Sequence, residues 1–380
     1  MLRNAELRSR PNLFQPFDGA AAYQLGITSF VDINGTYHTI IWSGQSIFQF
    51  NPAPLPLGNP WQFVGQAAPA NMQTNTVSYR AFANTIWYTN TAVLNSTVPI
   101  IEPFLGFWDG LTAAPVFQQT FGDASTSNSV AGISLTDSPT VGGSLPGAPT
   151  VTGPLSIGGL FLGELNNQLI LANVSVLDQA TGVIYPFPNL IWWSANGLPK
   201  QWDPTQNTSA GFNPFLDVPD LITGLVPMGV AGYIFRTDGI TQFAPSGSAV
   251  TPFTFDHMWA SDHGIGNVLP FSIAQYGPTA AFIATDNIYS LSITNAAAIG
   301  GTARDAIFAD IAAATGTCFA NIVPIYKNGY VYLQYVILIP FTGFVRMYVY
   351  SFEDKNWSPW DLPIFANPPG VTLTCAPNVV

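Results

Sequence analysis

Charged side chains are scarce in this sequence. Lys, Arg, Asp and Glu together make up 8% of its 380 residues, whereas globular domains average about 25%. Acidic residues outnumber basic ones by 21 to 10, which gives a formal net charge of -11. Because proteins hold nucleic-acid phosphates with Lys and Arg, this composition argues against static binding to nucleic acid.

Cysteine is equally rare, since only Cys318 and Cys375 are present. Two cysteines cannot form a multi-disulfide scaffold or a four-cysteine zinc site. The sequence also lacks the GxSxG, GxxxxGKS/T and GxGxxG motifs of hydrolases and nucleotide-binding proteins. Residues 1–14 contain no continuous apolar segment of the kind found in signal peptides, so we expect synthesis in the cytoplasm.

Apolar and aromatic residues, in contrast, reach 48% and 13% of the chain, together with 34 Gly and 32 Pro. Such a composition excludes an intrinsically disordered protein. The apolar runs are short and separated by Gly, Pro, Asn or Asp, which is typical of strands joined by turns. The longest run, Tyr330–Tyr350, is interrupted at Pro340–Gly343. We therefore predict two strands joined by a turn there, and no membrane span.

Helical periodicity is convincing in one segment, Thr302–Thr315. Thr302 is expected to cap the first turn and Gly316 to end the helix. Its apolar face is predicted to consist of Ala306, Ile307, Ala309, Ile311 and Ala313, with Asp310 at the edge.

Six segments repeat one order: an apolar strand, a turn and an aromatic-rich strand. They are Phe30–Phe50, Arg80–Trp108, Leu160–Pro204, Leu221–Pro245, Val268–Ile293 and Phe319–Pro363. Asn34-Gly35 and Asp238-Gly239 are hairpin signals within them. This repetition predicts an all-β fold, a β-propeller of about six blades with one short helix. A pair of β-sandwich domains is the alternative.

The propeller is predicted to be a single domain of residues 23–364, flanked by an N-terminal segment, 1–22, and a C-terminal tail, 365–380. Residues 110–154 depart from the repeat because they are rich in Ser, Thr, Gly and Pro and have little charge. Alone, such a segment would be a flexible loop. We predict an insertion in the propeller that orders against another subunit.

Histidines and aspartates offer one possible metal site. His257 and His263 lie next to Asp256 and Asp262, and such a set can bind a metal. Their spacing fits a polar loop better. His38 lies in an alternating strand pattern and is interpreted as an ordinary strand residue.

Paired carboxylates, the signature of glycoside hydrolases, are not assigned either. The candidates are Asp238, Asp256, Asp262 and Asp286. Asp238 and Asp286 are expected in turns, where Asp bonds locally to the backbone. We therefore predict no catalytic, metal-binding or cofactor-binding residues, and we expect that the chain is not an enzyme.

Five tryptophans could form a stacking platform for sugars or bases. They are Trp192, Trp193, Trp202, Trp357 and Trp360. Because aromatic residues on strands mostly pack in cores, packing is the preferred interpretation.

Four groups of residues follow one another in a distinctive order. They are Arg10-Pro11; Asn167–Leu171 with Ile191–Ser194 and Gln201–Pro204; Tyr233–Phe243 with Gly264–Gly266, Pro270, Ser272-Ile273, Ala281–Ile283 and Asp286–Tyr289; and Tyr348–Asp361. In this order the sequence resembles the β-propeller tail nozzle proteins of short-tailed bacteriophages, also called tail tubular protein B. It departs from them in its shorter length and in Asn287, which replaces a usual Gly.

The resemblance implies a structural virion protein of the phage tail. Subunits, six in expectation, would form a ring-shaped nozzle below the portal and adaptor proteins, in contact with these proteins and with tail fibres. Genome DNA would pass through the lumen during ejection, and the charge of -11 would keep its phosphates from sticking. No cofactor is implied.

Two other functions stay open. The tryptophans also fit a carbohydrate-binding or glycan-cleaving propeller of a tail component. The segment Trp357–Pro363 resembles a kelch-type blade end and fits a general interaction module.

Overall fold

The computed structural model describes most of the six predicted repeat units. The described residues are 24–43, 46–50, 61–66, 77–90, 103–111, 116–117, 155–178, 183–202, 209–215, 220–248, 251–259, 265–293, 295–316, 318–327 and 329–363. Both predicted flanking segments, 1–22 and 365–380, lie outside these ranges.

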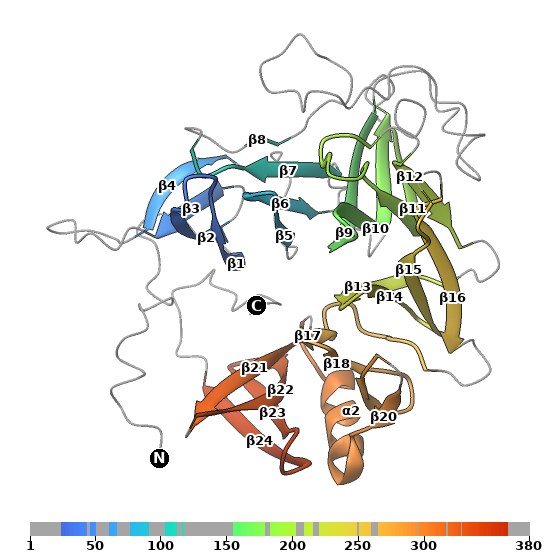
Figure 1. The fold of residues 1–380 in the computed structure, drawn as a ribbon. Helices are drawn as coiled ribbons and strands as arrows, with labels where there is room; N and C mark the ends of the chain where they lie inside the picture. The colour runs from blue at the N-terminus through green and yellow to red at the C-terminus, as the bar shows by residue number, and fades with distance from the viewer. Residues whose placement is uncertain are drawn as a thin grey trace, which may run out of the picture.

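The chain folds into a six-bladed β-propeller, which confirms the prediction (Figure 1). Each blade is a four-stranded antiparallel sheet whose strands pair in chain order. The first strand of each sheet lies toward the middle of the ring (Figure 1). Sandwich domains are excluded because the sheets follow one another around a centre rather than stacking in pairs.

The blades begin where the repeat units predict. Blade 1 contains β1 (Gln24–Val31), β2 (Tyr37–Ser43), β3 (Ser46–Phe50) and β4 (Trp61–Gln66); blade 2 contains β5 (Ser78–Phe82), β6 (Thr85–Asn90), β7 (Phe104–Trp108) and β8 (Val116–Phe117); blade 3 contains β9 (Leu155–Leu165), β10 (Gln168–Asp178), β11 (Val183–Trp193) and β12 (Gly211–Pro214). Blade 4 contains β13 (Ile222–Met228), β14 (Ala231–Arg236), β15 (Ile240–Pro245) and β16 (Phe253–Trp259); blade 5 contains β17 (Ala274–Tyr276), β18 (Thr279–Ile283), β19 (Ile288–Leu291) and β20 (Ala296–Ala298); blade 6 contains β21 (Phe319–Lys327), β22 (Tyr330–Phe341), β23 (Phe344–Ser351) and β24 (Asn356–Pro363).

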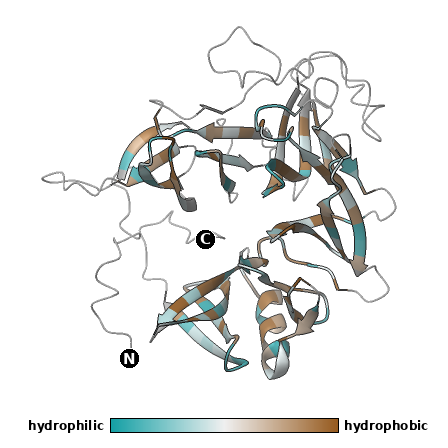
Figure 2. Cartoon of the chain, in the orientation of Figure 1, coloured by the Kyte–Doolittle hydropathy of each residue, from teal (hydrophilic) through white to brown (hydrophobic). Residues whose placement is uncertain are grey.

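Apolar side chains are buried between consecutive blades. Each of five clusters joins one blade to the next, from blades 1 and 2 through blades 5 and 6. Figure 2 shows hydrophobic segments along the strands of every blade. Among the described residues, no such cluster joins blade 6 to blade 1. The core is thus a row of shared interfaces, as expected for repeats that cannot bury both faces alone.

The apolar run at Tyr330–Tyr350 forms two strands, as predicted. Pro340 and Phe341 belong to β22, and the turn is limited to Thr342 and Gly343. Gly343 has a φ of +88°, a conformation that favours glycine. In the part of the chain that the structure describes, no helix is long and apolar enough to cross a membrane.

The predicted helix is present, but its start differs. A 3-10 turn, η2 (Gly301–Ala303), leads into α2 (Arg304–Ala312). Ala303 occupies the N-cap position of α2, and no side chain caps it. The prediction that Thr302 caps the helix is therefore wrong, because the preceding 3-10 turn already satisfies part of the first turn.

The packed face of α2 also differs from the prediction. Ile307 is buried, and it packs with residues spaced along the same side: Ala303, Phe308, Ile311 and Ala314. Three alanines expected on this face are exposed: Ala306, Ala309 and Ala313. The larger Ile and Phe side chains turn toward the cluster between blades 5 and 6, since they bury more apolar area than alanine does.

The insertion predicted at 110–154 begins inside blade 2 rather than after it. Val116 and Phe117 form β8, the fourth strand of this blade. Residues 112–115 and 118–154 lie outside the described residues. The contact of this segment with another subunit stays a prediction.

Candidate functional site

A hollow lies between the innermost strands of blades 2, 3, 4 and 5. It is lined by Arg80 on β5, Phe161 on β9, Leu225 on β13 and Gln275 on β17, among others, and it contains about 660 Å³ of space, part of it open to solvent. Because the first strand of each blade lies toward the middle of the ring, the hollow lies beside the propeller axis (Figure 1). Ligand pockets of proteins have volumes of about 300–1,000 Å³.

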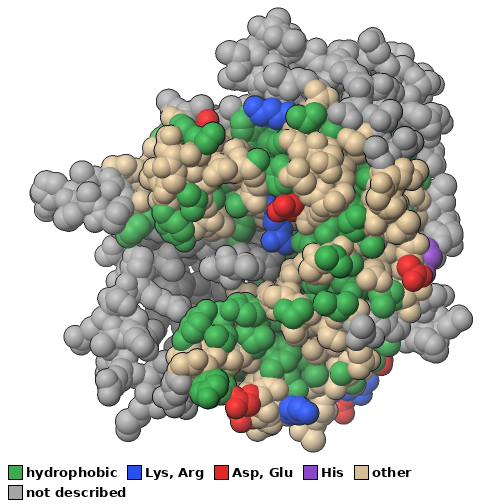
Figure 3. All heavy atoms as spheres, in the orientation of Figure 1, with side chains coloured by type: hydrophobic (Ala, Val, Ile, Leu, Met, Phe, Trp, Pro, Cys, Tyr) green, Lys and Arg blue, Asp and Glu red, His purple; other side chains and the backbone are tan. Residues whose placement is uncertain are grey.

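Arg80 and Glu164 occupy equivalent places on two neighbouring inner strands. The Ser78 hydroxyl on β5 accepts a hydrogen bond of 2.8 Å from the backbone N–H of Leu162 on β9. Arg80 follows Ser78 by two residues, and Glu164 follows Leu162 by two residues. Since side chains alternate along a strand, both charged groups lie on the same side of their strands as this contact. Figure 3 shows a basic and an acidic side chain next to each other near the middle of the ring.

Burial controls the electrostatics of these two groups. It lowers the pKa of Arg80, and the nearby negative charge of Glu164 partly opposes this shift. Burial likewise raises the pKa of Glu164, and the Arg80 charge partly opposes that. The Nε atom of Arg80 is buried and has no hydrogen-bond partner. The pair therefore consists of opposite charges that sense each other without an ion-pair contact in the described structure.

Apolar side chains from three more strands surround this pair. They include Leu160, Phe161, Leu225, Val226, Phe271 and Ile273. Gly224 makes their close packing possible, because a Cβ at this position would overlap the Cδ1 atom of Ile273. The rings of Phe161 and Phe271 lie 5.9 Å apart between centroids. The result is a charged pair set in an apolar wall.

The sequence gave no assignment for Arg80 and Glu164, because the strands that carry them are far apart along the chain. A signal was nevertheless present. Charged residues make up 8% of the chain, so a charge inside an apolar strand of a repeat is unusual and marks a position to inspect.

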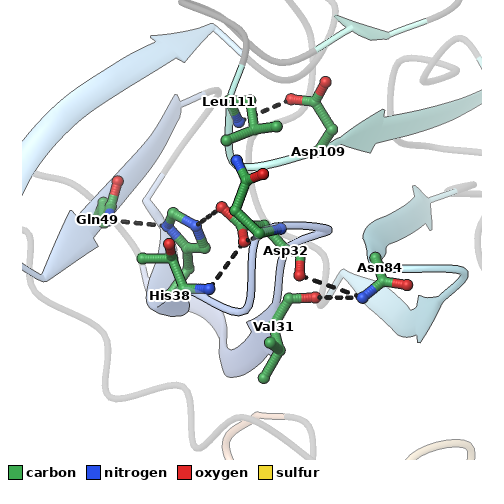
Figure 4. Close-up of polar contacts among 9 residues, drawn as sticks. Val31, Asp32, His38, Gln49, Asn84, Asp109 and Leu111 are labelled. Atoms are coloured by element: carbon green, nitrogen blue, oxygen red, sulfur yellow. Dashed lines mark hydrogen bonds and ion pairs between the residues drawn. The ribbon is translucent and has the colours of Figure 1, made fainter.

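A second polar cluster lies in blade 1 (Figure 4). The Nε2 atom of His38 lies 3.2 Å from Oδ2 of Asp32, and Gln49 donates a hydrogen bond of 2.9 Å to Nδ1 of His38. Asp32 also accepts 2.8 Å bonds from the backbone N–H groups of Asn34 and Thr36. This arrangement fixes the imidazole with its proton on Nε2.

The blade 1 cluster is structural rather than a ligand site. His38 is buried, stacks on Phe30 at 5.1 Å and meets Trp108 of blade 2 edge-on at 5.5 Å. Asn84 of blade 2 donates a 3.2 Å bond to the Asp32 carbonyl (Figure 4). The prediction of His38 as a strand residue is confirmed. Its partner Asp32 was missed, although Asp before Asn-Gly is a turn signal.

Acid is expected to weaken this cluster. Burial alone would raise the pKa of Asp32, but hydrogen bonds from Thr36, His38 and Asn34 outweigh it and lower the pKa below its ordinary value. The carboxylate therefore stabilises the fold fully above its unfolded-state pKa of about 3.9, and this contribution is lost as the pH falls through the lower folded-state value. We expect Asp32→Asn to flatten the acid side of the curve of unfolding free energy against pH, measured with urea. Two curves of equal slope in acid would contradict the assignment.

His257 lies in β16, so the prediction of a polar loop is wrong for this residue. Its Nδ1 atom is 3.2 Å from Nη2 of Arg236 and 2.9 Å from the Thr241 hydroxyl. Arg236 in turn pairs with Asp220 at 3.0 Å. These contacts belong to a buried structural network, because β16 is held against β15 where sequence spacing had indicated no regular element.

The remaining predicted candidates do not converge. Asp256 is exposed on β16, whereas Asp262 and His263 lie outside the described residues. Asp238 and Asp286 lie in turns, as predicted, on blades 4 and 5. Among the described residues, no group of three or more His, Cys, Asp and Glu side chains could hold a metal ion.

Four of the five candidate tryptophans pack against other side chains. Trp192 and Trp202 belong to the cluster between blades 2 and 3, Trp193 to that between blades 3 and 4, and Trp357 packs against that between blades 5 and 6. The preferred interpretation is correct for these. Trp360 differs, because 58% of it is exposed on β24. Cys318 is buried between blades 5 and 6, which raises its pKa to about 11, while Cys375 lies outside the described residues.

No protein-family model matches this chain. No curated protein matches it either. Solved structures with a similar course of the chain include a quinonprotein alcohol dehydrogenase-like protein from Bacteroides thetaiotaomicron, which is 9% identical, with 91% of this chain and 68% of that chain covered and a TM-score of 0.38. A mutant of the NanB sialidase from Streptococcus pneumoniae is 10% identical, with 82% and 65% covered and a TM-score of 0.40. A mutant of a Synechocystis apocarotenoid oxygenase is 8% identical, with 90% and 72% covered and a TM-score of 0.37.

These matches correct the expectation that the chain is not an enzyme. Proteins described as a dehydrogenase-like protein, a sialidase and an oxygenase share its propeller arrangement. A propeller without familiar catalytic motifs is therefore no ground for excluding catalysis, and the expectation is withdrawn. At this low identity the matches assign no reaction to the chain.

Proposed function

We propose that the protein is a structural subunit of a bacteriophage tail, which assembles with further copies of itself into the ring-shaped nozzle below the portal and adaptor. Genome DNA would pass through the ring during ejection. The ordered motifs that resemble tail nozzle proteins support this proposal, and so does the six-bladed propeller that they lead one to expect.

Exposed apolar side chains at one end of the propeller carry the proposal. The turns between first and second strands lie at the same end of the axis in every blade, because the blades repeat around that axis. Three of these turns present large apolar side chains to solvent: Ile33 (76% exposed) and Tyr37 in blade 1, Val230 (85%) in blade 4, and Tyr326 (74%) and Tyr330 (69%) in blade 6. We call these five residues the apolar rim.

An apolar rim fits contacts between subunits. Cores of protein interfaces are poor in charge and rich in aromatic residues, and exposed apolar patches mark interaction sites. Hydrophobic side chains also gather over blade 6 in the view of Figure 3. A low total charge leaves few like-charge contacts to oppose association of identical chains.

Charge placed on the rim is expected to prevent assembly. We predict that the purified protein forms oligomers whose masses are multiples of 40.7 kDa, and that the triple variant Ile33→Lys, Val230→Lys, Tyr330→Lys stays a monomer. Burying three ammonium groups in an apolar contact would be strongly unfavourable. Size-exclusion chromatography with light scattering measures the masses, and electron microscopy shows whether the oligomer is a ring.

Leu221→Lys is the matched control. Leu221 is 45% exposed and directly precedes β13, at the end of the axis opposite to Val230. This variant is expected to assemble like the unchanged protein. A monomeric unchanged protein, or a triple variant that still forms the ring, would overturn the proposal.

A further inference from the structure

We propose that the hollow between β5, β9, β13 and β17 binds a small molecule that carries one carboxylate, a hydrogen-bond donor and an apolar or ring-shaped body. Arg80 holds the carboxylate, and Glu164 accepts the hydrogen bond from the donor. This inference is independent of the proposed tail function.

Arg80 is a donor group without an acceptor. Its guanidinium carries five N–H donors in a planar fork, yet among the described residues it makes no hydrogen bond, and its Nε is buried. Buried donors without partners are unfavourable, and the usual partner of an arginine fork is a carboxylate or phosphate. Glu164 does not fill this role, because its effect on Arg80 is limited to the attraction of its charge.

Other polar groups of the hollow are already engaged by the protein. The Ser78 hydroxyl accepts from Leu162, the Thr223 hydroxyl donates to the Asn267 carbonyl at 2.7 Å, and the Gln275 amide donates to the Gly277 carbonyl at 3.1 Å. Arg80 and Glu164 are therefore the groups left to recognise a ligand. Their opposite charges demand an acceptor and a donor on the same molecule.

The acidic neighbour selects the type of anion. A phosphate monoester carries nearly two negative charges at pH 7, and Glu164 beside Arg80 repels the second charge. The net charge of -11 also disfavours anions in general. A monocarboxylate meets the Arg80 charge with the least repulsion, so we commit to a carboxylate rather than a phosphate.

The walls define the rest of the ligand. Phe161, Phe271, Leu225 and Ile273 offer apolar surface, and two of them are aromatic rings. Such a wall binds an aliphatic chain, an aromatic ring or the apolar face of a sugar ring. Sugar acids are thus one source of the carboxylate, and aromatic acids are another.

Isothermal titration calorimetry on the full chain tests the site with four probes. They are 4-hydroxybenzoate, which has the carboxylate, ring and donor; 4-hydroxybenzyl alcohol, which lacks the carboxylate; phenyl phosphate; and glucuronate. We expect 4-hydroxybenzoate or glucuronate to bind, with the neutral alcohol and phenyl phosphate at least tenfold weaker. If neither carboxylate binds, or if phenyl phosphate binds more tightly than both, the proposal is overturned.

Two variants assign the roles. Arg80→Gln is expected to weaken carboxylate binding about 10- to 100-fold, the effect of losing a hydrogen bond to a charged group. Glu164→Gln is expected to reduce the preference for 4-hydroxybenzoate over benzoate while benzoate itself binds no more weakly. Arg304→Gln, at an exposed arginine of α2, is the control and leaves binding unchanged.

Circular dichroism checks that each variant is folded. If Arg80→Gln does not fold, Arg80→Lys replaces it, because lysine keeps the charge but loses the fork and is expected to weaken binding as well. Unchanged carboxylate affinity in a folded Arg80 variant would refute the site. A protein that binds the carboxylate but stays monomeric would leave this inference standing and overturn the proposed tail function alone.

Discussion

Replacing Asp220 with Ala is expected to lower the free energy of unfolding by about 3–5 kcal/mol. The carboxylate pairs with Arg236 at 3.0 Å, and both side chains are almost wholly buried. Removing Asp220 leaves the guanidinium, whose Nε already has no partner, as an uncompensated charge inside blade 4. Asp220 also accepts a bond from the backbone N–H of Asp238 at the β14–β15 turn, so the turn loses an anchor. Urea unfolding followed by circular dichroism measures the change.

Two comparisons make this prediction sharp. Asp305→Ala breaks the exposed pair between Arg304 and Asp305 and should change the unfolding free energy by less than about 1 kcal/mol. The double variant Asp220→Leu, Arg236→Met removes both buried charges and should recover much of the loss, because well-packed apolar residues can replace a buried ion pair. If Asp220→Ala is no more damaging than Asp305→Ala, the pair does not stabilise blade 4 as described.

The change Trp192→Ala is expected to destabilise the protein by about 3–5 kcal/mol. Trp192 is fully buried in the cluster between blades 2 and 3, and its indole N–H donates a 2.8 Å bond to the Trp202 carbonyl. The substitution leaves a large cavity at a shared interface and an unpaired carbonyl. Thermal unfolding and urea unfolding both measure the loss.

Trp360→Ala is the matched control for this position. Its side chain is 58% exposed on β24, and a surface substitution of this kind changes stability by about 0.5 kcal/mol or less. Similar losses for the two tryptophans would contradict the division between a packed and an exposed tryptophan.

The repeat could be predicted because it is local. Each blade pairs its strands in chain order, so alternation and turn residues such as Asp238-Gly239 identify it without any long-range information. The packed face of α2 could not be predicted, because its orientation depends on the cluster between blades 5 and 6. The strand at Val116–Phe117 was hidden within a segment whose composition resembles a loop, and its pairing with β7 decides its structure.

The candidate site was beyond sequence reasoning for a related reason. Arg80 and Glu164 meet through the contact between Ser78 and Leu162, and this contact exists only after two blades have packed together. His257 illustrates the same limit, since Arg236 and Thr241 reach it from other strands of blade 4. Chemistry that is assembled from distant strands requires the tertiary arrangement.

The five shared clusters affect how the molecule comes apart. Blades 2 to 5 each share a cluster with two neighbours, whereas blades 1 and 6 share one each within the described residues. In a linear array with nearest-neighbour coupling, the terminal modules have the lowest local stability. Denaturation would then fray the toroid from its two ends, and β10 and β14 near its centre would keep their amide protons longest.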